Sequence, residues 1–172
     1  MFNKPLEIRT KRLLLKPLSI KDKEEMVLLL NDMNIKKTYM IPDFNSKEEE
    51  DKFFDRVMKL TSSDNHISYG VFLDNKVIGF INDVSIENDE IEVGYFIDSK
   101  EWNKGYASEA LEAMIDILFK IGFKRVIAGY FVGNEASRRV MEKCHMTPIN
   151  KEEVISYKNH DYLCKYYEII KV

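Results

Sequence analysis

The feature that most constrains the fold of this chain is an amphipathic stretch in its second half. Its apolar residues recur at intervals of three and four, which places them on one face of a helix. They are Ala107, Ala110, Leu111, Met114, Leu118 and Ile121. Gly122 follows directly and is typical of a helix end, and Phe123 can pack back onto the last turn. The pattern predicts a helix that begins near Lys104 and ends at Ile121.

Strand-like runs lie on both sides of this helix. Before it, two short runs are joined by the turn-forming pair Asp74-Asn75, which predicts a β-hairpin. A polar bend at Glu87-Asn88-Asp89 then leads into a third run. The predicted strands are Ser68–Leu73, Val77–Val84, Ile91–Ile97, Arg125–Phe131 and two strands between Ile149 and Ile170.

The first third of the chain predicts one strand and two helices. The apolar run Arg12–Leu18 is typical of a strand. Two capping boxes follow, one at Ser19 and one at Ser46, and each is typical of a helix start. The predicted helices outside the central one are Ser19–Leu30, Ser46–Leu60 and Asn134–Cys144, and the segment Asn31–Asn45 is predicted to be a loop.

These elements predict a mixed α and β (α+β) fold with about seven strands and about four helices. A chain of 172 residues is long enough for one compact domain and short for two. It contains no internal repeat, low-complexity tract or linker. We therefore expect one domain over residues 1–172.

Charge and cysteine content narrow the range of partners. The net charge is −3, and Lys and Arg are spread along the chain, which disfavours a nucleic-acid partner. No apolar run reaches the ~20 residues that a membrane-spanning helix needs, and no signal-peptide run is present. Cys144 and Cys164 are not in a metal-ligand spacing, so no metal is expected. These features favour a soluble cytoplasmic protein with reduced thiols.

The start of the central helix has the features of an anion site. Unpaired N–H groups and the helix dipole attract negative charge there, and Gly105 lets a bulky group approach the backbone. The segment Trp102–Glu109 therefore predicts a phosphate-binding site in outline. Neither the Walker pattern nor the three-glycine dinucleotide pattern surrounds Gly105, which sets those two nucleotide-binding loops aside. Glycines also open helices for purely steric reasons, so this feature alone is not specific.

Four segments, in this order, resemble the GNAT superfamily of N-acetyltransferases, and within it the branch of ribosomal-protein N-terminal acetyltransferases. They are Arg9–Leu18 as the first strand, Ile91–Ile97 as the fourth strand, Trp102–Ala107 as the pyrophosphate loop and Asn134–Ser137 at the helix beside the coenzyme arm. The resemblance spans the chain from about Ile8 to Ile169. It implies a mostly antiparallel, twisted sheet whose two central strands splay apart, with acetyl-CoA as co-substrate in the cleft.

The resemblance also implies a set of coenzyme contacts. In the family, pantetheine lies in the cleft like an added strand. Backbone groups of Tyr95, Phe96 and Ile97 are therefore expected to bond its amides, and Asn134 and Ser137 are expected beside pantetheine and its sulfur. The backbone amides expected to hold the pyrophosphate are those of Asn103, Lys104, Gly105, Tyr106, Ala107 and Ser108.

Direct acyl transfer requires a neutral amine, yet a free alkyl amine has a pKa of roughly 10. A nearby carboxylate that accepts the proton meets this need. Glu92 is our first choice for this base because it lies just before the coenzyme contacts, with Asp89 and Glu90 as alternatives. A solvent-facing or ion-paired structural role for Glu92 stays open, since a bulge at Gly94 would reset the alternation of side chains along the strand.

The proton donor to the departing thiolate is less clearly marked. Many relatives have a Tyr seven residues after the Asn, but this chain has Met141 there, which cannot donate. Ser137 resembles the donor proposed for this branch, and a role in packing beside the coenzyme stays open. His145 stands where relatives usually have glycine, and a cation at a helix end is favoured by the dipole without any catalytic role.

The sequence thus predicts an acetyl-CoA-dependent N-acetyltransferase that acts on a primary amine by direct transfer in a ternary complex. The amine belongs to a protein N-terminus or to a small molecule, and its identity stays open. Because Met141 replaces the usual Tyr, a non-catalytic acyl-CoA-binding or regulatory domain is the alternative. Formation of a homodimer also stays open.

Overall fold

The computed structural model describes residues 1–172 and is built around one eight-stranded sheet. Its strands are β1 (Ile8–Arg9), β2 (Leu14–Lys16), β3 (Tyr69–Leu73), β4 (Lys76–Glu87), β5 (Glu90–Ile97), β6 (Arg125–Phe131), β7 (Thr147–Tyr157) and β8 (His160–Ile170). They are ordered β1-β2-β3-β4-β5-β6-β8-β7. Neighbours are antiparallel except β5 and β6, which run parallel.

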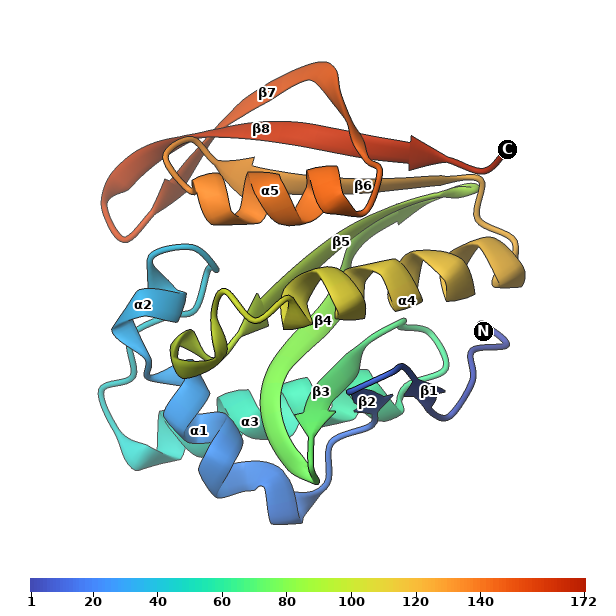
Figure 1. The fold of residues 1–172 in the computed structure, drawn as a ribbon. Coiled ribbons are helices and arrows are strands. Elements are labelled where there is room, and N and C mark those ends of the chain that lie inside the picture. The colour runs from blue at the N-terminus through green and yellow to red at the C-terminus, as the bar shows by residue number, and fades with distance from the viewer.

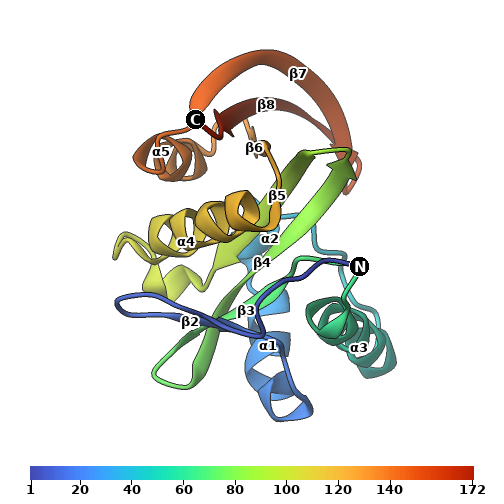
Figure 2. The ribbon, with the colours of Figure 1, turned by 90° about the vertical axis from the view of Figure 1, so that its right-hand side faces the viewer.

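Helices cover both faces of this sheet. They are α1 (Lys23–Leu30), α2 (Met33–Lys36), α3 (Lys47–Ser62), α4 (Tyr106–Ile121) and α5 (Glu135–Lys143), with short 3-10 helices at Ile20–Asp22 and Ser99–Glu101. Figure 2 shows α4 on one side of the β3–β5 sheet and α3 on the other. Two large apolar cores result, one beneath α4 and α5 and one beneath α1, α2 and α3, and a smaller cluster lies between β6 and β8. None of the helices is both long enough and apolar enough to cross a membrane.

The predicted central helix is confirmed, with the expected end. Gly122 has a φ of +118°, which a residue with a side chain rarely adopts, and the Phe123 N–H donates to the Leu118 carbonyl over 3.1 Å. The predicted N-cap at Ser46 is also formed, because the Ser46 hydroxyl accepts from the Glu49 N–H over 3.2 Å. The capping box is only half formed, since the Glu49 carboxylate accepts from the Asn45 N–H over 2.8 Å instead of from Ser46. Both features depend on contacts between residues that are close in sequence, so the sequence pattern could predict them.

The structure has eight strands and five α-helices, whereas the sequence predicted about seven strands and about four helices. The segment Asn31–Asn45, predicted to be a loop, contains the short helix α2, which starts because the Asp32 carboxylate accepts from the Asn34 N–H over 2.7 Å. The strand predicted over Arg12–Leu18 is reduced to β2. Pro17 directly follows β2 and cannot donate to a ladder. The added strand β1 pairs with β2.

The two parallel strands separate halfway along their length. Pairing of β5 with β6 runs from Glu90 opposite Arg125 to Val93 opposite Ala128 and stops there, although both strands continue. Figure 1 shows β5 and β6 diverging toward the side where α2 lies. The splay implied by the family resemblance is therefore present. A bulge at Gly94, which would have reset the alternation of side chains along β5, is not present, because Gly94 pairs regularly with Asn82. The irregularity lies on β4, between Asp83 and Ser85.

Candidate functional site

A cleft of about 430 Å³ occupies the space where β5 and β6 diverge. It extends from the N-termini of α4 and α5 through the sheet to α2. Most of the residues expected to contact the coenzyme line it: Tyr95, Phe96, Ile97, Asn103, Gly105, Tyr106, Ala107, Ser108, Asn134 and Ser137. Lys104 does not, because its side chain turns toward Glu101, with 2.7 Å between Nζ and the carboxylate.

The loop before α4 presents a row of backbone N–H groups that donate no hydrogen bond. None of the amides from residue 103 to residue 108 has an acceptor within the protein, and no side chain caps the helix. The first bonded amide of this helix is that of Glu109, which donates to the Gly105 carbonyl over 3.1 Å. Gly105 has a φ of +83°, which turns the chain into the helix without a side chain above the amides. Such a row is suited to a phosphate group.

Contacts from the N-terminal hairpin hold this loop in place. The Arg12 guanidinium donates to Glu109 over 2.7 Å and to the Lys104 carbonyl over 2.9 Å, and it stacks on the Tyr106 ring. The Thr10 hydroxyl donates to the same Glu109 carboxylate over 2.6 Å. Burial acts to raise the pKa of Glu109, but the hydrogen bonds from Thr10 and Arg12 outweigh it and lower that pKa. The carboxylate is thus held ionised beside Arg12.

We expect Arg12→Lys to weaken acetyl-CoA binding about tenfold, because Lys cannot bridge Glu109 and the Lys104 carbonyl at once. Isothermal titration measures the change. The matched control is Arg9→Lys, since Arg9 is mostly exposed and pairs only with Glu7. Equal affinities of the two variants would show that the loop needs no support from Arg12.

The backbone of β5 faces the cleft at alternate residues. The Asp98 N–H donates to the Ile78 carbonyl over 2.6 Å, so these two residues form a hydrogen-bonded antiparallel pair. By alternation, Phe96 bonds with β4, whereas the N–H and C=O of Tyr95 and Ile97 point away from it. The Trp102 indole donates to the Ile97 carbonyl over 2.8 Å. The backbone groups left for a ligand are therefore those of Tyr95 and the N–H of Ile97.

The other wall of the cleft is the start of α5. The Asn134 side chain caps this helix by accepting from the Ser137 N–H over 3.2 Å. The Ser137 hydroxyl lies 3.1 Å from the Tyr95 hydroxyl, so the two walls meet at these side chains. Burial raises the pKa of the Tyr95 hydroxyl, which keeps it protonated. Met141 is fully buried in the core and does not line the cleft.

Several lining residues were not anticipated from the sequence. Tyr39 closes the cleft from the loop after α2, and its hydroxyl donates to Asn82 over 2.6 Å. Arg139 and Lys143 line the cleft from α5 and form no ion pair. Their i, i+4 spacing was the available signal, because it places both cations on one face of a helix. His145 lines neither this cleft nor the next cavity, and its φ of +61° accounts for the usual glycine at this helix end.

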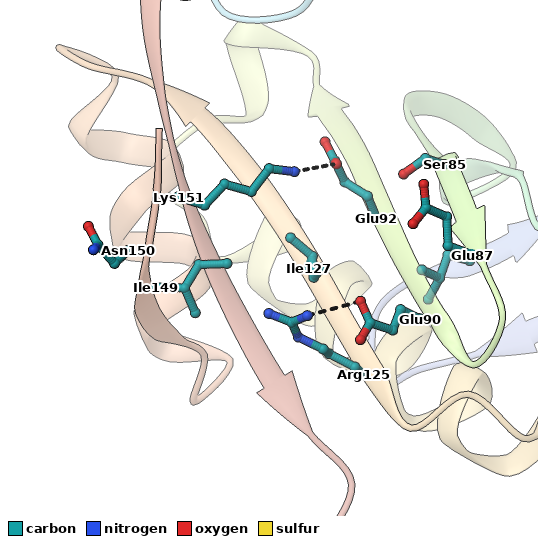
Figure 3. Close-up of a pocket in the computed structure, with 10 residues that line it drawn as sticks. Ser85, Glu87, Glu90, Glu92, Arg125, Ile127, Ile149, Asn150 and Lys151 are labelled. Carbon is teal, nitrogen blue, oxygen red and sulfur yellow. Dashed lines mark hydrogen bonds and ion pairs between the residues drawn. The ribbon is translucent and has the colours of Figure 1, made fainter. Parts of the chain in front are cut away.

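Glu92 lies in a second cavity, of about 390 Å³, on the face of the sheet opposite α4 (Figure 3). Figure 3 shows the Lys151 side chain reaching from β7 across the sheet to Glu92 on β5. The ammonium lies 3.9 Å from the carboxylate, and the Glu92 side chain is 18% exposed. Burial raises the pKa of Glu92, Lys151 opposes the shift and Glu153 adds to it.

Glu92 and the cleft are close along one strand. Gly94 lines the cleft, and side chains two residues apart point to the same face of a strand roughly 7 Å apart. Asp89 and Glu90 lie further from the splay, at the paired end of β5. Hydrogen bonding and charge from Lys124 hold the pKa of Asp89 below its usual range, and Glu90 pairs with Arg125 at 2.9 Å. Glu92 is therefore the best placed of the three carboxylates.

No group of three or more His, Cys, Asp or Glu side chains is arranged to hold a metal ion. The site consists of a cleft with free amides, a partly buried hydroxyl pair and a carboxylate next to the opening. These are the groups that acyl transfer from a phosphate-bearing thioester to an amine requires.

Comparison with known proteins identifies the family. Residues 12–147 match the acetyltransferase (GNAT) domain. An uncharacterized N-acetyltransferase of Bacillus subtilis, YnaD, is 32% identical over 145 residues, covering 82% of each chain. A GNAT-family acetyltransferase from Bacillus anthracis has a TM-score of 0.81 at 28% identity, with 95% of this chain and 98% of that chain covered.

A neighbour from the ribosomal-protein branch has the same fold. The ribosomal L7/L12 alpha-N-protein acetyltransferase, solved with coenzyme A, has a TM-score of 0.81 at 20% identity, with 95% of this chain and 97% of that chain covered. Acetyl-CoA is the acyl donor of GNAT enzymes, and the cleft between β5 and β6 has the groups to accept it. The chain belongs to the GNAT family and is an N-acetyltransferase.

Proposed function

We propose that the chain transfers an acetyl group directly from acetyl-CoA to a primary amine, with both substrates bound at once. The observation that carries this proposal is the row of free amides at residues 103–108, which opens into the cleft between β5 and β6. When these amides hold the pyrophosphate of acetyl-CoA, its thioester would lie at the opening beside Gly94, close to Glu92. No covalent intermediate on the protein is needed if the amine arrives there.

The chain offers complementary groups for each part of the coenzyme. The amides of the loop would hold the pyrophosphate, aided by the dipole of α4. Arg139 and Lys143 have free positive charges in the same cleft and would contribute to phosphate binding. The backbone groups of Tyr95 and the N–H of Ile97 would bond the pantetheine amides as a neighbouring strand does.

Glu92 would accept the proton of the acceptor amine, directly or through a water molecule. Its raised pKa makes it a stronger base than an ordinary carboxylate. A cleft-facing N–H of β5 would stabilise the thioester oxygen as charge develops on it. The amine nitrogen then forms the amide bond while the carbon–sulfur bond breaks.

The Tyr95 and Ser137 hydroxyls would return a proton to the departing thiolate. They lie 3.1 Å apart, so one can donate while the other replaces the proton. Tyr95 also donates to the Ser137 carbonyl over 3.3 Å, which fixes its orientation. This pair takes the place of the Tyr that many relatives carry where this chain has Met141.

We expect Ser137→Ala and Tyr95→Phe each to lower kcat by at least about tenfold with little change in coenzyme affinity. Because the two hydroxyls act as one unit, the double variant should lose little more than the worse single variant. Steady-state kinetics with the best acceptor measures this. If the loss in kcat of the double variant equals the product of the two single losses, the hydroxyls do not form a relay.

Thiol release from acetyl-CoA across a panel of primary amines tests the proposed function. The expected result is acceptor-dependent release of one thiol per acetylated amine, confirmed by mass spectrometry. Tight coenzyme binding without release on any amine or N-terminal peptide would instead favour a binding domain.

A further inference from the structure

Lys151 lines the cavity around Glu92, and its ammonium group lies among three other side chains, those of Glu92, Glu153 and Tyr166. It lies 3.9 Å from Glu92 and 3.4 Å from Glu153, and 4.2 Å from the centre of the Tyr166 ring. The Tyr166 hydroxyl donates to Glu153 over 2.8 Å, which fixes both groups. Two carboxylates and an aromatic face are the surroundings that bind an alkylammonium ion.

Lys151 is held loosely in this site. Direct contacts between an ammonium and a carboxylate have an N–O distance of about 2.8 Å, and both of its distances are longer. The Lys151 side chain is also 39% exposed. Pairs of this kind contribute little to stability. Another cation can therefore replace Lys151 without disturbing the fold.

The remaining charges of the cavity favour a cation. Arg125 is neutralised, because it pairs with both Glu90 and Glu168. Glu87 lines the cavity from β4 and forms no ion pair (Figure 3). If Lys151 moves out, Glu92 and Glu153 lose their only nearby positive charge. The cavity then has an excess of negative charge beside the opening of the coenzyme cleft.

From this arrangement we infer that the cavity binds the acceptor, and that the acceptor is an aliphatic diamine or polyamine. One amine would be deprotonated by Glu92, and a second ammonium would replace Lys151 between Glu153 and Tyr166. Both carboxylates lie within 4 Å of one nitrogen, so a short aliphatic chain joins the two positions. This inference rests on the proposed function and adds to it the acceptor class.

The test compares spermidine with butylamine, which has only the reacting amine. Lys151→Ala should raise the ratio of kcat/KM for spermidine to that for butylamine about fivefold, through a lower KM for spermidine. Adding Glu153→Gln to this variant should return the ratio close to its wild-type value. Because a ratio is measured, changes in folding or in the strength of the base cancel. Lys165→Ala is the control, since Lys165 lies on the same hairpin and pairs with Glu152.

Two results would overturn the inference. One is an unchanged ratio in Lys151→Ala, and the other is an equal rise in Lys165→Ala, which would indicate a general charge effect. Failure of the proposed function looks different, because then no amine is acetylated although acetyl-CoA binds. In that case titration of spermidine into the coenzyme A complex still decides the inference: tighter binding to Lys151→Ala than to Lys165→Ala supports it, and equal binding contradicts it.

Discussion

Gly105→Glu should abolish acetyl-CoA binding, with a loss in affinity of at least about 100-fold. The substitution places a carboxylate above the free amides of residues 103–108, where the pyrophosphate would lie. Like charges brought together in a binding site cost several kcal/mol. The Cβ would also lie 3.2 Å from the Arg12 guanidinium, and a φ of +83° strains any side chain. Isothermal titration measures the affinity.

The matched control for this variant is Gly122→Glu. Gly122 ends the same helix at its other end, with a φ of +118° and open space around it, so the substitution adds the same charge and similar strain. We expect coenzyme affinity to stay within about twofold there. Similar losses in both variants would assign the effect to helix destabilisation, and retained affinity in Gly105→Glu would show that the loop has another role.

Glu92→Gln should lower kcat by about 100-fold or more while leaving coenzyme affinity unchanged, because it removes only the proton acceptor. Glu90→Gln is the control on the same strand, since Glu90 lines the same cavity but pairs with Arg125. A few-fold effect is expected there. Equal losses from the two substitutions would argue against Glu92 as the base.

The pH dependence follows from the raised pKa of Glu92. The base acts only when ionised, so kcat should fall as pH drops through this pKa, at a higher pH than for an ordinary carboxyl group. A carboxyl whose pKa is raised by folding stabilises the fold below its unfolded pKa, and that stabilisation is lost as pH rises. At neutral pH, Glu92→Gln should therefore be at least as stable as the wild type, which thermal unfolding measures.

Local patterns gave most of the fold. The apolar spacing of α4, the turn at Asp74-Asn75 and the N-cap at Ser46 act between residues a few positions apart, and the structure has all three features. Helix α2 was missed because its only signal is one Asp cap on four residues. The splay of β5 and β6 came from the family resemblance, whereas their parallel pairing was not predicted, since no local pattern specifies how two distant strands pair or where they separate.

Long-range contacts explain what the sequence could not predict about the site. Arg12 and Glu109 are 97 residues apart, and nothing in either segment indicates the other. Likewise the arch of β7 brings Lys151 to Glu92, so the ion pair and the raised pKa depend on tertiary structure. Tyr95 was expected to contact the coenzyme through its backbone only. Its hydroxyl lies 3.1 Å from that of Ser137 because β5 and the start of α5 form the two walls of one cleft.

The most direct test of the account is to follow the backbone amides of residues 103–108 by nitrogen-15 NMR during titration with coenzyme A. If these free N–H groups bind the pyrophosphate, they should show the largest proton shifts, in the direction of stronger hydrogen bonding. Pantetheine, which has no phosphate group, should leave the shifts of these amides nearly unchanged. The account would be contradicted if coenzyme A changed the chemical shifts of other amides but left those of residues 103–108 unchanged.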